Sequence, residues 1–403
     1  MTNNKMLDFT PEEYAARKAR LVSLMQAEGL DGLLLSTKEN IRYFTGFQSI
    51  VWESKISTPA FLVVSSRGDW RMIGSKSSVG TMGITTWLPE NELDFYDKNA
   101  APGTRPATFL DAIKYQLDKL GLMHKKIGME IGIGFRPHLT FPVLSGLMDF
   151  LKASGCETLD ASALLWKIRS VKSAQELAYF GQACAKNCLL YEKAFDSVVP
   201  GVTTERNLMQ VMGAEAFRLD CDNILDMGIR CGLDRDPHTN CPSSDRVIGS
   251  RHEREVLMID GGPSYRGYYS DIIRTAVVGK PTQKQLDTHS ILVEACYLGL
   301  SKLKPGEPLE DPVKAVDEFL DKKGMTPINR TLHWIGHGLG LDFHEYPCLE
   351  LGTKEIAKPG MCFACEPCVC DENGMFGIEE NVVVTDTGYE LMTPFRHDLI
   401  SIS

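Results

Sequence analysis

The stretch Ile259–Asp271 reads IDGGPSYRGYYSD and carries a carboxylate near each end of a predicted hairpin. An apolar run leads into Asp260, and two tyrosines precede Asp271 by a few positions. If the turn is centred between Tyr265 and Arg266, the two aspartates face each other across the strands. Like charges in that position destabilise a sheet. A divalent metal ion between the two acids would remove the repulsion.

A second segment repeats this arrangement with glutamates. Glu366 lies in MCFACEP and Glu379 in FGIEENVVVT, and Asp371–Gly374 between them reads DENG, a strong hairpin signal. A four-residue loop would place Glu366 opposite Glu379, whereas a tighter Asn-Gly turn would pair Glu366 with Asn381 and leave Glu379 on the diagonal. His337 lies in GHGLG, where glycines allow close approach of the backbone. The resulting set of four carboxylates and one imidazole is Asp260, Asp271, His337, Glu366 and Glu379.

The sequence around this set resembles the pita-bread metalloenzymes, a family that includes methionine aminopeptidase, Xaa-Pro aminopeptidase, prolidase and the metal-free creatinase. The matching segments are IDGGPSYRGYYSDIIRT, GHGLGLDFHE, KPGMCFACEP and GIEENVVVTDTG, in that order. The resemblance extends weakly into the N-terminal half. It implies an α+β chain with a smaller N-terminal α/β creatinase-like domain over residues 1–160 and a C-terminal pita-bread catalytic domain over residues 161–403.

The residues by themselves support an α+β chain with antiparallel hairpins. Thr10-Pro11-Glu12-Glu13 is a capped helix start, and Gly29 is expected to end that helix. Residues 60–65 and 70–73 are expected to pair as antiparallel strands around Arg67-Gly68-Asp69. Strands and helices then alternate through the first half of the chain, which is typical of a small α/β domain.

Composition narrows the range of partners. The chain has 403 residues, of which 43% are hydrophobic and 24% are charged, as in an ordinary globular protein of one or two domains. Its formal net charge of -10 argues against nucleic acid and anionic membrane, since both need a basic face. No apolar run approaches a transmembrane length, and the N-terminus lacks the apolar core of a secretory signal. We expect a cytoplasmic protein that acts on a small molecule or a short peptide.

The chain contains 12 cysteines, and four of them invite a metal-cluster interpretation. Cys362, Cys365, Cys368 and Cys370 spell C-x-x-C-x-x-C-x-C, which resembles an iron–sulfur or zinc motif. Because side chains alternate faces along a strand, Cys365 would point away from Cys362 and Cys368. We therefore interpret them as buried free cysteines that behave as small hydrophobic residues.

The chemistry of the five residues favours a pair of metal ions. Oxygen-rich donors with one imidazole suit manganese first, with cobalt, iron or zinc as alternatives. Four acids exceed the charge of one divalent ion, so two ions are expected. The resemblance implies that Asp271 and Glu379 bridge two ions, that Asp260 holds one, and that His337 and Glu366 hold the other. A bridging hydroxide would then be the nucleophile, and Glu366 would move its proton to the leaving amine.

Two further histidines match active-site histidines of the family. His344 follows His337 by seven residues, and His238 lies in DRDPHTNCPSSDR before the first metal strand. Both would hydrogen-bond a substrate carbonyl as it becomes an oxyanion. The chain departs from the family at two places. Gly377 stands where prolidase-like members carry an arginine, and Thr58 stands where creatinase has a carboxylate-binding arginine, so substrate recognition is not inherited from either relative.

Three functions compete. The first and leading one is a dinuclear-metal hydrolase of an amide bond, specifically an Xaa-Pro dipeptidase or aminopeptidase. The second is an enzyme with a non-peptide substrate, either a C–N hydrolase like creatinase or a C–S lyase of the same fold. The third is a binding protein with a retired active site, although such proteins usually lose ligands. The resemblance also implies a homodimer, in which Trp52 would either contact the partner subunit or be an exposed loop residue.

Overall fold

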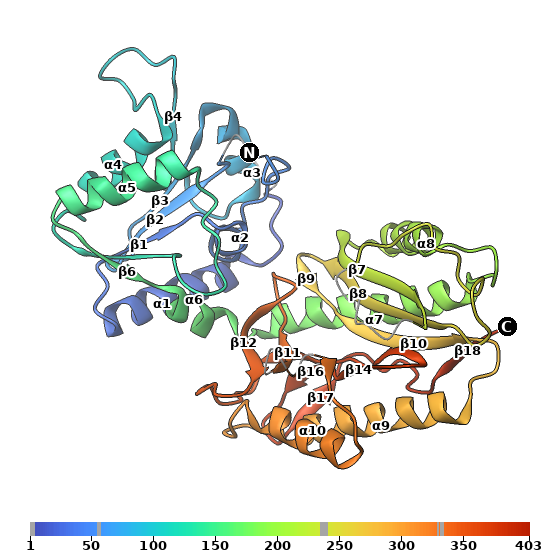
Figure 1. Ribbon diagram of the computed structural model, residues 1–403. Coiled ribbons are helices and arrows are strands. Elements are labelled where there is room, and N and C mark those ends of the chain that lie inside the picture. The colour runs from blue at the N-terminus through green and yellow to red at the C-terminus, as the bar shows by residue number, and fades with distance from the viewer. Residues whose placement is uncertain (1–4, 55–57, 234–240, 329, 331–333) are drawn as a thin grey trace. The chain divides into compact units, whose positions relative to one another are not determined.

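The computed structural model describes residues 5–54, 58–233, 241–328, 330 and 334–403 (Figure 1). The chain divides into two compact units, one ending at Ile168 and the other beginning at Arg169. This division falls within the last turn of α6 (Ser162–Arg169), whereas residue 160, the boundary expected from the resemblance, precedes that helix.

The N-terminal unit is an α/β structure built on one mixed sheet. In sheet order its strands are β4 (Leu93–Tyr96), β3 (Trp70–Ser75), β2 (Phe61–Ser65), β1 (Gly32–Leu35), β5 (Lys126–Met129) and β6 (Glu157–Asp160). Strand β2 is antiparallel to both neighbours, as expected for the β2–β3 pair, and the other pairings are parallel. Its remaining elements are α1 (Pro11–Ala27), α2 (Lys38–Thr45), η1 (Lys76–Ser78), α3 (Val79–Thr85), η2 (Glu90–Glu92), α4 (Phe109–Lys119) and α5 (Phe141–Ala153).

Two local predictions for this unit can be compared with the structure. Helix α1 begins as expected, because the Thr10 hydroxyl accepts a hydrogen bond from the Glu13 N–H at 3.3 Å. Trp52 was expected either at a subunit contact or exposed on a loop, and both interpretations are wrong. Its side chain is only 3% exposed, and its ring packs edge-on against Phe47 and His138. Burial within its own unit explains this tryptophan without a partner.

The C-terminal unit contains two larger sheets and a separate two-stranded ribbon. The first sheet has the order β18 (Ile400–Ile402), β10 (Ile272–Val278), β8 (Val256–Tyr265) and β7 (Asn223–Gly232), with β9 (Tyr268–Tyr269) paired to β8. The second has the order β12 (Glu345–Glu350), β11 (Trp334–Gly338), β13 (Cys362–Cys365), β16 (Glu380–Val384) and β17 (Tyr389–Leu391). The ribbon pairs β14 (Cys368–Asp371) with β15 (Gly374–Gly377).

Each large sheet is covered by a pair of helices, as Figure 1 shows. Helices α7 (Ala174–Asp196) and α8 (Glu205–Arg218) share an apolar core with β7, β8 and β10. Helices α9 (Gln283–Leu300) and α10 (Asp311–Lys322) share another with β11, β13 and β16. Each sheet therefore has one face that packs against helices, and its alternate side chains point to the opposite face.

The first acid-bearing hairpin has a different register from the expected one. Tyr265 pairs with Tyr268, so the turn is the two-residue loop Arg266-Gly267. Both loop residues have positive φ, 51° and 86°, which is typical of tight hairpin turns that match strand twist. Asp260 consequently pairs with Ile273 and not with Asp271. The two aspartates are diagonal neighbours, and the prediction that they face each other directly is wrong.

The second hairpin has the first of the two registers considered. Asp371 pairs with Gly374, and Cys365 pairs with Glu380. These pairings belong to one register across both strand pairs, and that register places Glu366 opposite Glu379. The loop is therefore Glu372-Asn373, within the DENG segment, and the alternative pairing of Glu366 with Asn381 does not occur.

Candidate metal centre

The five predicted ligands come together in the C-terminal unit. Asp260 lies in β8, and Leu257 and Ile259 on either side of Met258 belong to the helix-packed core, so Asp260 points to the other face. Asp271 immediately precedes β10, His337 lies in β11, and the two glutamates flank β13 and β16. The donors that lie within 4.8 Å of one another form three groups: Asp260, Asp271 and Glu379; His337, Glu366 and Glu379; Asp271, His337 and His344.

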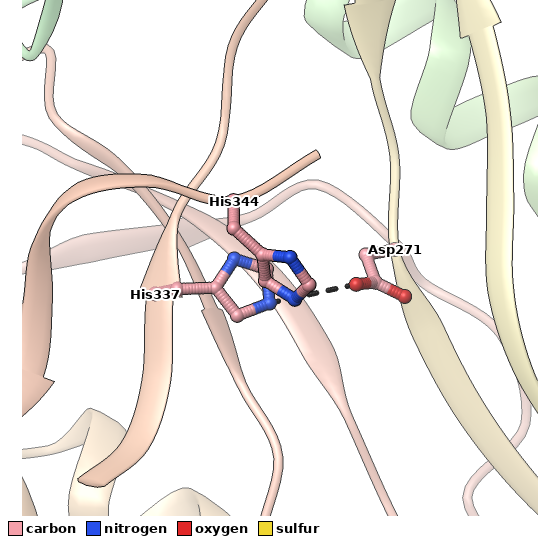
Figure 2. A group of neighbouring side chains, drawn as sticks. All are labelled: Asp271, His337 and His344. Carbon is pink, nitrogen blue, oxygen red and sulfur yellow. Dashed lines mark ion pairs between the residues drawn. The ribbon is translucent and has the colours of Figure 1, made fainter. Parts of the chain in front are cut away.

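His337 lies among the carboxylates of both sheets. Its Nε2 is 3.3 Å from Glu366 Oε1, 3.5 Å from Asp271 Oδ2 and 4.0 Å from Glu379 Oε1. Figure 2 shows this nitrogen directed at the Asp271 carboxylate. The other ring nitrogen, Nδ1, is 3.0 Å from the Gly338 carbonyl, which can only accept a hydrogen bond. When the ring is neutral, its proton therefore lies on Nδ1 and the Nε2 lone pair faces the acids.

The glycines around His337 allow the close backbone approach that the sequence predicts. A Cβ on Gly336 would lie 2.0 Å from the Ala364 carbonyl oxygen of the paired strand. A Cβ on Gly338 would lie 2.7 Å from the Glu345 carbonyl oxygen, and one on Gly340 would lie 2.5 Å from the Glu345 carboxylate. Larger residues would push these segments apart and move the imidazole away from the acids.

The clustered acids strongly disfavour ionisation without a cation. Burial, followed by the charges of Asp271 and Glu366, raises the pKa of Asp260 well above its ordinary value. The same causes, together with Asp260, raise the pKa of Glu379. Burial lowers the pKa of His337, but Asp271 and Glu366 more than offset this and raise it to about 10. The burial and mutual repulsion of these acids thus favour a positive charge among them, either a proton or a metal cation.

Glu379 gives the most direct test of whether these residues fit a metal. Its side chain is fully buried, and neither carboxylate oxygen has a hydrogen-bond partner among the described residues. Burying an unpaired carboxylate is costly, so such oxygens are normally bonded or coordinated to a metal. Glu379 also belongs to two of the three donor groups. The donor set therefore fits hard or borderline divalent ions shared by several carboxylates.

Of the two additional histidines, one is at the site and the other lies outside the described residues. The His344 ring contacts the His337 ring, with centroids 4.2 Å apart at 69° (Figure 2). The residue is exposed at one edge, yet the protein packed around its ring, together with His337, lowers its pKa to about 3. A neutral imidazole is therefore available at the rim of the acid cluster. His238 lies in residues 234–240, which the structure does not describe.

A buried ion cluster fixes the segment that carries His344. The next residue, Glu345, receives Arg169 on one carboxylate oxygen and Lys172 on the other, the latter at 3.0 Å. Burial raises the pKa of Glu345, but these two cations lower it to about 2. The sequence does not predict this cluster, because Arg169 and Lys172 are more than 170 positions from Glu345 and no local pattern joins them.

Two more contacts were missed. Asn381 bonds to the backbone of Asp271, and Arg230 lies 3.4 Å from Asp260. The sequence does carry a signal for the second contact. An arginine within the strand sequence GIRCG is expected to have a partner, because arginine is seldom buried without one.

The glycine at position 377, where the resemblance led us to expect an arginine, has a local structural reason. A Cβ there would lie 2.7 Å from Cys368 Sγ and 2.8 Å from Ile273 Cγ2, so these neighbours fill the space.

Cys365 and Cys368 of the C-x-x-C-x-x-C-x-C motif lie in different hydrophobic cores. Cys365 belongs to the core shared with α9, whereas Cys368 packs with Met258, Ile273 and Met375. All four are free thiols. Cys365 therefore points away from Cys368, as expected, although the two lie on the separate strands β13 and β14.

The chain is similar to known proteins in both of its units. Residues 178–386 match the metallopeptidase family M24, and residues 17–171 match the creatinase/prolidase N-terminal domain. An Xaa-Pro dipeptidase from Pyrococcus furiosus is 24% identical over 95% of this chain and 99% of its own length. An ectoine hydrolase from Halomonas elongata is 23% identical over 98% of each chain. The solved Xaa-Pro dipeptidase of Bacillus anthracis superposes with a TM-score of 0.80 at 24% identity, covering 96% of this chain and 99% of that one.

The fold and the acid–histidine site together define a metallo-hydrolase. More than half of the chain matches one family, and the chain belongs to the metallopeptidase family M24. The pita-bread fold and the N-terminal creatinase-like domain that the resemblance implied are both confirmed. Among the described residues, none of the helices is long and apolar enough to cross a membrane.

Proposed function

We propose that the protein hydrolyses the amide bond of an Xaa-Pro peptide with two divalent metal ions. The observation that carries the proposal is the gathering of Asp260, Asp271, His337, Glu366 and Glu379 into overlapping donor groups. Asp271 and Glu379 each belong to two groups, which supports a bridging role for both. Asp260 would complete one ion site, and His337 with Glu366 would complete the other.

Bound ions would lower the pKa of a water molecule and make it nucleophilic near neutral pH. Glu366 would accept a proton from that water, since its carboxylate is the least buried of the three acids around His337. It would then pass the proton to the amine that leaves. His344 would donate a hydrogen bond to the substrate carbonyl oxygen as negative charge develops there, because its ring lies at the rim of the cluster.

Manganese is the first metal to test, followed by cobalt, iron and zinc. The protein is expected in the cytoplasm and as a homodimer. Both expectations are still predictions, and sedimentation of the purified protein measures the second. The substrate class is supported by the Xaa-Pro dipeptidases among the relatives.

The alternative is hydrolysis of a C–N bond in a non-peptide substrate. The ectoine hydrolase among the relatives supports this alternative, as does the glycine at position 377, where the resemblance led us to expect an arginine. A C–S lyase of the same fold remains the other non-peptide candidate. Both are tested beside the peptides.

The experiment compares hydrolysis of Xaa-Pro dipeptides and tripeptides with turnover of creatine, ectoine and dimethylsulfoniopropionate. Protein is stripped with chelator and reloaded with manganese or cobalt. Metal-dependent cleavage before proline is expected, and Glu366→Gln should reduce kcat by about 100-fold or more, since general acid–base catalysis contributes that much. Glu372→Gln is the matched control, because Glu372 lies exposed in the hairpin loop and pairs with Lys284. Turnover of only a non-peptide compound would replace the peptidase proposal with the alternative.

A further inference from the structure

Arg230 is a buried cation at the acid cluster whose donors are largely unused. It lies in β7 and its side chain is 8% exposed. Its Nη1 lies 3.4 Å from Asp260 Oδ2, which is long for a hydrogen bond between charged groups. Its Nε is buried and has no acceptor among the described residues. Since a guanidinium offers five N–H donors, most of its bonding capacity is unfilled by the described part of the chain.

The neighbouring glycine leaves room for this guanidinium. A Cβ on Gly228 would lie 2.2 Å from both Nη atoms of Arg230 and 2.3 Å from Cζ. Gly228 is also the residue that pairs with Asp260 across β7 and β8. Its φ is not positive, so the backbone does not require glycine here. The missing side chain therefore lets the guanidinium lie flat beside Asp260, at the edge of the proposed metal centre.

A second buried arginine in the same unit shows how a structural guanidinium is satisfied. Arg274 is 1% exposed and donates to Glu380 Oε1 at 2.8 Å, to the Glu379 carbonyl at 2.7 Å and to the Ile273 carbonyl at 3.0 Å. Arg230 makes no bond of comparable length to any residue that the structure describes. The contrast indicates that Arg274 holds the fold together, whereas Arg230 is placed for an acceptor that the described chain does not supply.

We infer that Arg230 binds a carboxylate group of the substrate beside the Asp260 position. A carboxylate offers two oxygens that match the planar fork of a guanidinium. An ion bound by Asp260 would compete for Oδ2 and release the weak contact that now occupies Nη1. This inference rests on the proposed hydrolase function and sharpens it. For a peptide substrate, a carboxylate next to the scissile bond is the C-terminus of a dipeptide, so dipeptides are preferred over longer peptides.

The test measures binding of carboxylate and amide pairs to manganese-loaded protein by calorimetry. The pairs are proline with prolinamide, and N-acetylglycine with N-acetylglycinamide. Wild type should bind the carboxylate of at least one pair about tenfold more tightly than its amide, which is the effect of one charged contact. Arg230→Met should reduce the ratio to about twofold or less. Gly228→Ala should do the same while it keeps the charge, because a Cβ there would displace the flexible end of Arg230.

Arg206→Met is the matched control, since Arg206 is exposed and pairs with Asp245 at 2.8 Å. This variant should keep the wild-type ratio. The inference is overturned if wild type shows no carboxylate preference in either pair or if Arg230→Met keeps the preference. It is also overturned if Arg230→Met loses its manganese, measured by elemental analysis, because Arg230 would then act on the metal site. If Arg230→Met loses the carboxylate preference and wild type cleaves no Xaa-Pro peptide, the role of Arg230 in carboxylate binding stands and the peptidase proposal is rejected. If wild type cleaves Xaa-Pro peptides and Arg230→Met keeps the wild-type ratio of carboxylate to amide affinity, only the role of Arg230 is rejected.

Discussion

The side-chain amide of Asn381 bonds to both backbone groups of Asp271. Its Oδ1 accepts the Asp271 N–H at 2.9 Å, and its Nδ2 donates to the Asp271 carbonyl oxygen. The same Oδ1 accepts the Ser270 hydroxyl at 2.9 Å. Asn381 lies in β16 of the second sheet, and Asp271 precedes β10 of the first. One amide therefore fixes a proposed bridging carboxylate of one sheet relative to the other sheet.

Replacing Asn381 should weaken both the fold and the site. Asn381→Ala removes both bonds that the buried Asp271 backbone makes to this amide, and each such loss costs about 1–3 kcal/mol. We expect the free energy of unfolding to fall by about 2–4 kcal/mol and the manganese content per chain to fall with it. Denaturant titration and elemental analysis measure the two effects. Asn99→Ala, at an exposed loop position, serves as control. Full metal content in the Asn381 variant would show that Asp271 is placed without the amide.

Glu345 should stabilise the protein in a pH-dependent way. Its folded pKa of about 2 lies below the ordinary value of 4.5, because Arg169 and Lys172 outweigh the effect of burial. The stabilisation is therefore complete above about pH 4.5 and is lost as the pH falls toward 2. Glu345→Gln removes the buried charge that Arg169 and Lys172 share, although Asp342 stays 3.3 Å from Arg169, and should cost about 3–5 kcal/mol at pH 7.

The stability difference between wild type and Glu345→Gln should shrink between pH 5 and pH 2. Thermal unfolding over that range measures the difference. Glu355→Gln is the control, since Glu355 is exposed and lies outside the ion cluster. A difference that stays constant as the pH falls would mean that the carboxylate does not depend on its two cations.

Metal removal should destabilise the protein more at high pH than at low pH. Burial and mutual repulsion raise the pKa values of Asp260 and Glu379 above their unfolded values. In metal-free protein, the contribution of these two acids to the free energy of unfolding is thus greatest when they are protonated, and it is lost as the pH rises. Bound ions replace those protons and restore the stability.

The gap in Tm between manganese-loaded and metal-free protein should therefore widen from pH 5 to pH 8. Calorimetry of the two forms in matched buffers measures the gap. Excess magnesium is the control for ionic strength, since it is expected to dehydrate reluctantly and to bind this imidazole-containing site less well. An equal Tm gap at both pH values would show that repulsion between the ionised acids does not destabilise the metal-free protein.

The register of the first hairpin should depend on Gly267. Its φ of 86° lies in the left-handed region, where a Cβ is strained. Gly267→Ala should lower the free energy of unfolding by about 1–2 kcal/mol. Gly80→Ala, in helix α3 with nothing within 4 Å of the added Cβ, should not be destabilising. Denaturant titration measures the free energy of unfolding of both variants. An equal loss in both would show that the turn at Gly267 does not determine the register.

The sequence predicts the site better than it predicts the contacts that support the site. Asp260, Glu366 and Glu379 stand beside apolar runs of the sequence. The DENG segment indicates a hairpin between the two glutamates but leaves two registers open, and the strand pairing selects the one in which they oppose each other. The first hairpin was misplaced because the turn signal of Arg266-Gly267 was overlooked. Trp52 was misjudged because a loop position gives no information about the packing of distant residues such as His138.

The contacts of Asn381 and Arg230 could not be found in this way. Asn381 and Asp271 are 110 positions apart, and Arg230 and Asp260 are 30 apart. Neither pair belongs to a periodic pattern or a local motif. Their contacts follow from how the strands pair and how the two sheets pack, which depends on the whole core and not on a short window of residues.

The central claim is that Asp260, Asp271, His337, Glu366 and Glu379 hold two divalent ions. Anomalous diffraction at the manganese edge, from crystals of manganese-loaded protein, measures this most directly. The account predicts two peaks about 3.5–4 Å apart among these side chains, with Asp271 and Glu379 contacting both. A single peak, or strong peaks elsewhere with none among the five residues, would contradict it.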